Sequence, residues 1–346
     1  MRVAVALGID REWAESVTLV REAEQMGVHS VWVPEAWGYD AAAPLGYLAA
    51  RTSTIRIGSG IFQVDARSAV MTAQTAASLA VMTAGRFLLG LGVSGPQVME
   101  GLHGVPFAHP LRRMRETVEV IRLALSGTRV VYNGAHIRLP RLGGEGKALR
   151  LAVDADLQPP IYLATLSPRM LELTGELADG WLGASFIPEA SGAYLDHLAV
   201  GAERAGRSLE QMDLSQAAEV AFGDDVDEMV AGRKQALAFS LGGMGSAKSN
   251  FYNAAYARQG WSEVATKVQA LWLEGRRADA AAAVPAEMVL QTALIGTESM
   301  VRDRLAVWQA AGVTTLRVYP AGETLDARVA TLGRVVEMVS HLQRID

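Results

Sequence analysis

Three glycines at positions 90, 92 and 95 form the stretch GLGVSG, a G-x-G-x-x-G spacing directly after an apolar run. In dinucleotide-binding folds this spacing brings the backbone close to a pyrophosphate at a helix start, and an acid about 20 residues later binds the ribose. Here Pro96 follows at once, the next helical pattern begins near Leu111, and the next strand-like run ends at Asn133. The stretch therefore indicates a strand end and the loop after it. Ser94 is not a hydrolase nucleophile, because G-x-S-x-G would need glycine at Pro96.

The stretch LSPRMLEL, residues 166–173, has the pattern of a helix start that can bind an anion. Ser167 is expected as N-cap and Pro168 at the first helical position, with Arg169 beside unpaired backbone amides. Free N–H groups and the helix dipole both favour a negative group at such a position. We therefore expect a phosphate or another anion at Ser167 to Arg169.

Other reactive residue types are scarce. The chain has no cysteine, which excludes disulfides, thiolate nucleophiles and thiolate-bound metals. No H-E-x-x-H motif or carboxylate cluster is present, so we expect no metal. Of six histidines, only His103 and His109 follow the predicted fourth strand closely enough to reach a site, with an ordinary surface role as the alternative.

A repeated pattern of helix, glycine and strand must position these residues. It occurs in EAEQMGVHSVWV, AVMTAGRFLLGLG, TGELADGWLGAS and WQAAGVTTLRVYP. Gly27, Gly85 and Gly312 are expected to end helices in the left-handed conformation, which glycine adopts without a Cβ clash. Strands are expected at 3–7, 30–34, 55–61, 87–92, 161–164, 180–184, 214–221 and 315–319, and helices at 12–26, 68–82, 111–125, 169–178 and 326–342.

Most of the expected strands are continuous apolar runs, which is typical of parallel strands buried on both faces. Eight strands alternating with helices predict an α/β fold of the (β/α)8 TIM-barrel type. A barrel takes roughly 250 residues. We therefore predict a single domain over residues 1–346, with insertions at about 129–158, where Asn133-Gly134 indicates a hairpin, and 242–292.

The composition of the chain limits the kinds of partner that it can bind. A formal net charge of −5 argues against nucleic acid, because that binding needs clustered Lys and Arg. No apolar run approaches the roughly 20 residues that span a bilayer, and the first residues lead straight into a strand pattern. We expect a cytoplasmic protein that does not bind membranes and that acts on a small molecule.

Four segments, in order, resemble the luciferase-like monooxygenase superfamily: VWVPEAWGYDA, IRIGSGIFQV, GRFLLGLGVSGPQVMEGLHGVPF and IYLATLSPRMLELTGELADGW. They are most similar to its branch of oxidoreductases that use the 5-deazaflavin coenzyme F420, and the likeness extends through GGMGSAKSNFYN. The resemblance implies a barrel that holds the deazaflavin in a cleft at the carboxyl ends of the strands. The family often forms dimers, so a homodimer is an open alternative to a monomer.

The resemblance also implies the cofactor-binding residues. It places Glu35 beside the ring, with an ion pair at the barrel rim as the alternative, and a bulge behind the ring that often has a cis peptide. The full set is Glu35, Gly60 and Ile61 of the bulge, Val93, Ser94 and Gly95 along the ring or ribityl chain, Ala164, Thr165, Leu166, Ser167 and Arg169 toward the phosphate, and Lys248 as a contact of the anionic tail.

One position departs from the family pattern. Some relatives have a histidine directly after the acid of the second strand as a proton donor, but this chain has Ala36. The catalytic residues expected instead are Glu35, Asp40 and His103, with solvent as another proton source. We expect an enzyme that moves a hydride between F420 and a small organic substrate. An FMN-dependent monooxygenase and a non-catalytic flavin-binding protein are the alternatives.

Overall fold

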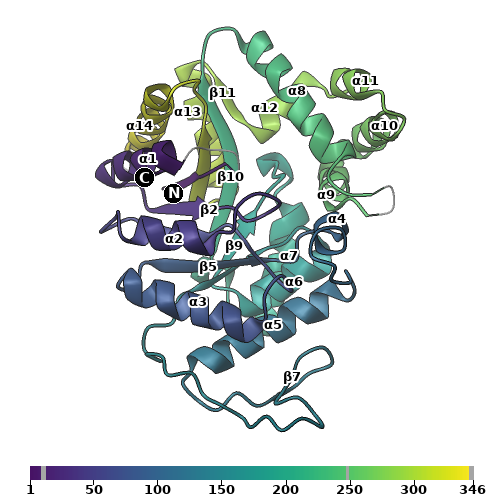
Figure 1. The fold of residues 1–346 in the computed structure, drawn as a ribbon. Helices are drawn as coiled ribbons and strands as arrows, with labels where there is room; N and C mark the ends of the chain where they lie inside the picture. Colours follow the sequence, from purple (N-terminus) through teal and green to yellow (C-terminus); the bar gives the residue numbers. More distant parts are fainter. Residues whose placement is uncertain (9–12, 247–248, 343–346) are drawn as a thin grey trace.

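A computed structural model describes residues 1–8, 13–246 and 249–342. Eight parallel strands close into a barrel, because β12 pairs with both β1 and β10, and β10 also pairs with β9 (Figure 1). The predicted (β/α)8 barrel is therefore confirmed. Its strands are β1 (Arg2–Ala6), β2 (Ser30–Val33), β3 (Arg56–Ser59), β5 (Phe87–Gly92), β8 (Ile161–Ala164), β9 (Gly180–Gly183), β10 (Asp213–Phe222) and β12 (Thr315–Pro320). Two short strands, β4 (Phe62–Gln63) and β11 (Leu294–Gly296), extend the sheet beside β5 and β10.

An outer layer of helices surrounds the barrel. Gly27, Gly85 and Gly312 have φ of +75°, +85° and +90°, which confirms the predicted left-handed helix ends. The helices are α1 (Trp13–Gln25), α2 (Ala42–Ala49), α3 (Ala69–Met82), α4 (Pro96–Met99), α5 (Pro110–Leu125), α6 (Pro168–Leu177), α7 (Gly192–Arg204), α13 (Glu298–Ala310) and α14 (Leu325–Leu342). No helix in the described ranges is long and apolar enough to cross a membrane.

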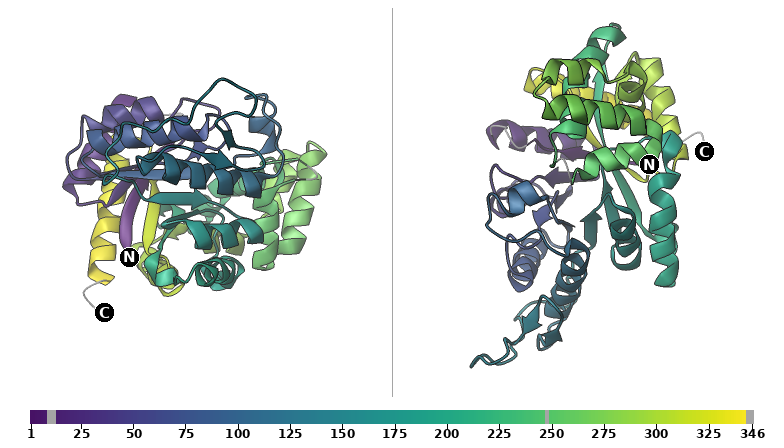
Figure 2. Two further views of the ribbon diagram at one scale, coloured as in Figure 1. Left: turned by 90° about the horizontal axis from the view of Figure 1, so that it is seen from below. Right: turned by 90° about the vertical axis from the view of Figure 1, so that its right-hand side faces the viewer.

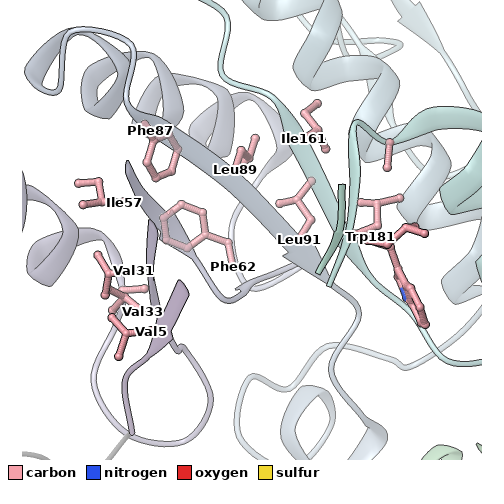
Figure 3. Close-up of a cluster of buried hydrophobic side chains, with 14 of the residues drawn as sticks. Val5, Val31, Val33, Ile57, Phe62, Phe87, Leu89, Leu91, Ile161 and Trp181 are labelled. Carbon is pink, nitrogen blue, oxygen red and sulfur yellow. The ribbon is translucent and has the colours of Figure 1, made fainter. Parts of the chain in front are cut away.

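The main hydrophobic core lies between the strands and the helices. Figure 3 shows Ile57, Phe62, Phe87 and Leu89 packed together in this layer. Because side chains alternate along a strand, the other half of each strand faces the barrel interior. A separate small cluster fills that interior and consists of Ala4, Trp32, Leu88, Tyr162 and Leu182.

Between α5 and β8 the chain leaves the barrel and forms the hairpin of β6 (Tyr132–Asn133) and β7 (Arg138–Leu139), which Figure 2 shows extending away from the strands. The hairpin indicated by Asn133-Gly134 is present, and its loop consists of residues 134–137. The carboxylate of Glu116 accepts hydrogen bonds from the backbone amides of residues 135–137 at 2.8–2.9 Å. This buried acid, not the turn alone, holds the hairpin against α5.

A helical segment follows β10 and lies beside the barrel at the upper right of Figure 1. Its elements are α8 (Val226–Gly242), α9 (Phe251–Tyr256), a π-helical turn η3 (Ala257–Trp261), α10 (Ser262–Leu273), α11 (Arg277–Ala282) and α12 (Ala286–Thr292). They share a second apolar cluster that includes Leu241, Val268 and Met288. Since α8 starts at the carboxyl end of β10, the segment lies over that end of the barrel, where barrels keep their sites.

Candidate active site

Aromatic side chains form the floor of the barrel interior. The rings of Trp32 and Tyr162 meet edge to face with centroids 5.1 Å apart. Gly58 leaves room for Trp32, because a Cβ at position 58 would lie 2.6 Å from the indole. Ile61 and Ala164 pack on this floor and are partly exposed. The floor is therefore closely packed, and Ile61 and Ala164 lie between it and the barrel mouth.

A bulge between β3 and β4 forms one wall of the barrel mouth. The peptide bond between Gly60 and Ile61 is cis, as the family resemblance implied. Below it, the Ser59 hydroxyl donates to the Gly90 carbonyl and accepts from the Gly90 amide, both at 2.9 Å. A Cβ at Gly92 would lie 2.9 Å from the Ile61 side chain. The glycines of β5 are thus required by close packing against the bulge.

Glu35 is a fully engaged carboxylate. Arg67 donates to its two oxygens at 2.8 and 2.9 Å, and the amides of Ala41 and Gln63 donate at 3.1 and 3.2 Å. The Arg67 guanidinium also lies 4.5 Å from the centroid of the Phe62 ring. Glu35 is 9% exposed, so these contacts replace its hydration. The carboxylate joins the loop after β2 to the strand that follows the bulge.

Two serines directly beyond strand ends have backbone conformations that side chains rarely adopt. Ser94, after β5, has φ of +58°, and Ser185, after β9, has φ of +54°. Such residues cost about 1–3 kcal/mol each and cluster at functional sites. The Ser185 carbonyl is held by the Gln259 amide at 2.7 Å and by the Tyr194 hydroxyl at 3.1 Å. The helical segment therefore fixes one of the two loops.

The loop from β8 to α6 presents a helix start. Ser167 is the N-cap, Pro168 is the first helical residue, and the Ser167 side chain makes no capping bond. Within the described ranges, the amides of Arg169 and Met170 have no acceptor beyond the helix. Arg258 of the helical segment donates to the Leu166 carbonyl at 2.6 Å. Arg258 and free amides thus lie at this end of the site, whereas Arg169 lines a separate pocket with Arg115 and Glu176.

A cavity of about 300 Å³ lies between the barrel mouth and the helical segment. The polar groups in its wall include the paired Glu219 and Arg233, 2.8 Å apart. Burial raises the pKa of the Tyr256 phenol to about 12, so it stays protonated at neutral pH. The lining residues are Ala184, Ser185, Phe186, Ala217, Ala218, Glu219, Arg233, Ala236, Leu237, Ser240, Tyr252, Tyr256, Val289, Thr292, Ala293 and Tyr319.

The residues expected from sequence fall into three groups. The first group lies at the barrel mouth and consists of Gly60, Ile61 and Ala164. Two loops continue from the strand ends there, residues 93–95 after β5 and residues 166–169 after β8. Other side chains have structural partners: the Thr165 hydroxyl bonds to Thr174 in α6 at 2.8 Å, and Asp40 accepts the Ala43 amide at 3.0 Å. His103 is exposed, and Lys248 lies outside the described residues.

Sequence reasoning missed most of the residues that line the cavity. Glu219 lies within the predicted strand 214–221 and Tyr319 ends the predicted strand 315–319, and strict alternation along β10 and β12 would have placed both on the interior face. Tyr252 and Tyr256 stand four apart in the insertion, which is the spacing of one helix face. Arg317 inside β12 was missed as well, because the sequence analysis did not consider the effect of a charged residue within a buried strand.

Comparison with known proteins identifies the family. The model of the luciferase-like monooxygenase family matches residues 1–315. The chain belongs to this family.

Several members of the luciferase-like family are similar to this chain over most of its length. The chain is 38% identical over 320 residues to a Mycobacterium tuberculosis protein named "Putative coenzyme F420-dependent oxidoreductase", covering 90% of this chain and 91% of that one. It is 31% identical over 222 residues to the 5,10-methylenetetrahydromethanopterin reductase of Methanolobus tindarius, covering 64% and 65%. The structure of the coenzyme F420-dependent tetrahydromethanopterin reductase from Methanopyrus kandleri is also similar. It aligns over 98% of this chain and 99% of its own chain with a TM-score of 0.82, and at 24% sequence identity this likeness shows the shared fold.

Proposed function

We propose that this chain is an oxidoreductase that uses coenzyme F420 and transfers a hydride between the deazaflavin and a small organic substrate. One observation of the structure carries the proposal: the partly exposed Ile61 and Ala164 pack on an aromatic floor inside the barrel, and a cavity of about 300 Å³ lies at the barrel mouth. A flat ring needs such an opening, and a second small molecule needs the adjoining space. The name of the M. tuberculosis relative supports F420 as the ring.

The residues present fit a long anionic cofactor. The Gly60–Ile61 bulge and Ala164 would face the ring, and the loop of 93–95 would follow the ribityl chain. The free amides at Arg169 and Met170, with the Arg258 side chain nearby, would hold a phosphate. When bound, a deazaflavin accepts or donates a hydride at the central carbon of its ring.

The protein's part in the reaction is to position, to exclude water and to exchange a proton. We assign Glu35 to positioning, because Arg67 and two amides engage both of its oxygens. Glu219 lines the cavity and also pairs with Arg233, but its side chain is 46% exposed and not enclosed like that of Glu35, and we propose that it exchanges the proton that accompanies the hydride. Proton transfer of this kind contributes about 100- to 10,000-fold in rate. Catalytic roles for Asp40 and His103 remain predictions, as do a homodimer and a cytoplasmic location.

An FMN-dependent monooxygenase is the second candidate, because the family model itself is that of monooxygenases. The two differ in the ring that binds and in whether oxygen is consumed. Purified protein is titrated with F420 and, separately, with FMN while cofactor fluorescence is followed. F420 binding with hydride exchange and no oxygen uptake is expected; FMN binding with oxygen uptake would replace the proposal with the second candidate.

A substitution at the barrel mouth tests where the ring binds. Ala164→Leu adds three carbons above the Tyr162 floor and is expected to weaken F420 binding by about tenfold or more, since a misplaced side chain of this size costs about 1–3 kcal/mol. Ala282→Leu on the exposed face of α11 is the matched control and should bind like wild type. Equal binding by both variants would show that the ring lies elsewhere.

A further inference from the structure

Arg317 is a buried cation inside the barrel. Leu316 and Val318 of β12 pack in the outer core, so Thr315, Arg317 and Tyr319 face the interior. Arg317 is 7% exposed, and its single hydrogen bond within the described chain is from Nη2 to the Gly183 carbonyl at 2.5 Å. Its Nε is buried without a partner.

No carboxylate of the described residues forms an ion pair with Arg317. Asp213 is the acid near enough to act on its charge, but that carboxylate already accepts from Arg2, Thr314, Thr315 and Tyr162 at 2.5–3.0 Å. Burial lowers the pKa of Arg317, and the neighbouring Tyr319 phenol and Asp213 carboxylate oppose that effect only in part. An arginine nevertheless stays protonated at neutral pH, so the positive charge is present and incompletely compensated.

Arg317 lies directly beneath the cavity. Ala217, which pairs with Arg317 across β10 and β12, lines the cavity, and so does Tyr319, the next inward residue toward the carboxyl end. Arg317 therefore lies on the interior face of β12 at the level of a residue that lines the cavity. A buried charge is retained at a cost in stability unless something pairs with it. No partner for its Nε lies within residues 1–8, 13–246 and 249–342, and a ligand that enters the barrel can supply one.

We propose that Arg317 binds an anionic oxygen group, a carboxylate or an enolate-like oxygen, of a ligand that enters the barrel at its carboxyl end. The planar guanidinium can pair with such a group through two parallel hydrogen bonds. Two ligands could bring it, the substrate or the ring of the cofactor, and this distinction rests on the proposed function. The anion site itself does not, because it is a property of the free protein.

The first experiment uses formate as a small anionic probe and needs no cofactor. Thermal unfolding of the free protein is followed as formate is raised, in wild type, Arg317→Met and the exposed control Arg276→Met. We expect Tm to rise with formate in wild type and in Arg276→Met and to stay flat in Arg317→Met, since a ligand stabilises only the state that binds it. Without formate, Arg317→Met should melt no lower than wild type, because removal of an unpaired buried charge relieves its desolvation.

A formate-dependent rise in Tm that persists in Arg317→Met would overturn the proposal, and so would its absence from wild type. If Arg317→Met does not fold, Arg317→Lys replaces it: the lysine keeps the charge but not the planar fork, so a reduced formate effect is expected. An undiminished effect in Arg317→Lys would count against pairing through the fork.

The second experiment assigns the source of the anion. F420 binding, oxidised and reduced, is measured by fluorescence in wild type and Arg317→Met. A loss of tenfold or more for one cofactor form assigns the anion to the ring. Unchanged cofactor binding with a raised KM and a smaller change in kcat assigns it to the substrate. Cofactor binding, KM and kcat that all match wild type would overturn a role in the active site. Failure of F420 to bind wild type would refute the proposed function and leave the formate result standing.

Discussion

Replacing Glu35 with glutamine separates a structural role from a catalytic one. The substitution removes the charge but keeps the size of a side chain that accepts four hydrogen bonds, two of them from Arg67. Breaking a buried ion pair costs about 3–5 kcal/mol, because the remaining charge is left without a partner. The Arg67 side chain is 20% exposed and can recover part of its hydration. We therefore expect a loss of about 2–4 kcal/mol in the free energy of unfolding.

Thermal and urea unfolding measure this loss, and F420 titration measures its effect on the site. Glu35→Gln should lower Tm by several degrees and weaken cofactor binding together with turnover, because the loop after β2 loses its attachment to the bulge. Replacing the partner as well, in Glu35→Gln with Arg67→Met, should restore part of the stability, since no unpaired charge remains. Glu274→Gln removes an acid from an exposed ion pair and should leave Tm unchanged.

One result would refute this reasoning: a Glu35→Gln protein with the Tm and cofactor affinity of wild type but greatly reduced turnover. That combination would mean that Glu35 exchanges a proton, and that its contacts with Arg67 are incidental to stability.

Two further predictions concern the scaffold. Burial raises the pKa of the Glu116 carboxyl, but hydrogen bonds from three backbone amides outweigh it and hold this pKa below its ordinary value. The stabilisation by Glu116 is therefore complete above its pKa in the unfolded chain and is lost as the pH falls through its pKa in the folded protein. Glu116→Gln should cost about 1–3 kcal/mol in the free energy of unfolding at pH 7 and flatten the acidic part of a plot of Tm against pH, and an unchanged acidic part would contradict this. Gly58→Ala places a Cβ 2.6 Å from the Trp32 ring and should lower the free energy of unfolding by about 1–3 kcal/mol. Gly232→Ala in α8 has no neighbour within 4 Å of the new Cβ and should raise the stability slightly. Equal changes in Tm for the two variants, measured by thermal unfolding, would disprove the packing argument.

The barrel could be predicted because its signals are local. Each αβ join combines a helix period, a glycine with positive φ and an apolar run, and Gly27, Gly85 and Gly312 all adopt the expected conformation. The helical segment could be located only as an insertion. Its position over the barrel depends on long-range contacts such as Gln259 with the Ser185 carbonyl, which no local pattern encodes.

The site was predictable in outline and not in its charges. Family resemblance located the bulge at Gly60 and Ile61, because a motif marks it. The partner of Glu35 is Arg67, 32 residues later and in no motif, so the sequence left open whether this acid faces a ligand or an arginine. Arg317 was missed for a related reason. The sequence shows that the strand contains an arginine, but only the structure shows whether a neighbouring residue pairs with its charge.

The interior of the barrel divides along its axis into a satisfied end and an unsatisfied one. At the amino end, Asp213 is surrounded by an arginine and three hydroxyl groups, and Tyr162 links this network to the aromatic floor. Toward the carboxyl end, alanines such as Ala184 and Ala217 line the cavity, and the Arg317 Nε has no acceptor among the residues that the structure describes. A stable protein has no need of such an asymmetry, because larger apolar residues could fill that end at lower cost. The small side chains and the spare charge are what a barrel requires if a flat ligand and an anion complete its packing, which is why the two experiments on Ala164 and Arg317 address one site from opposite sides.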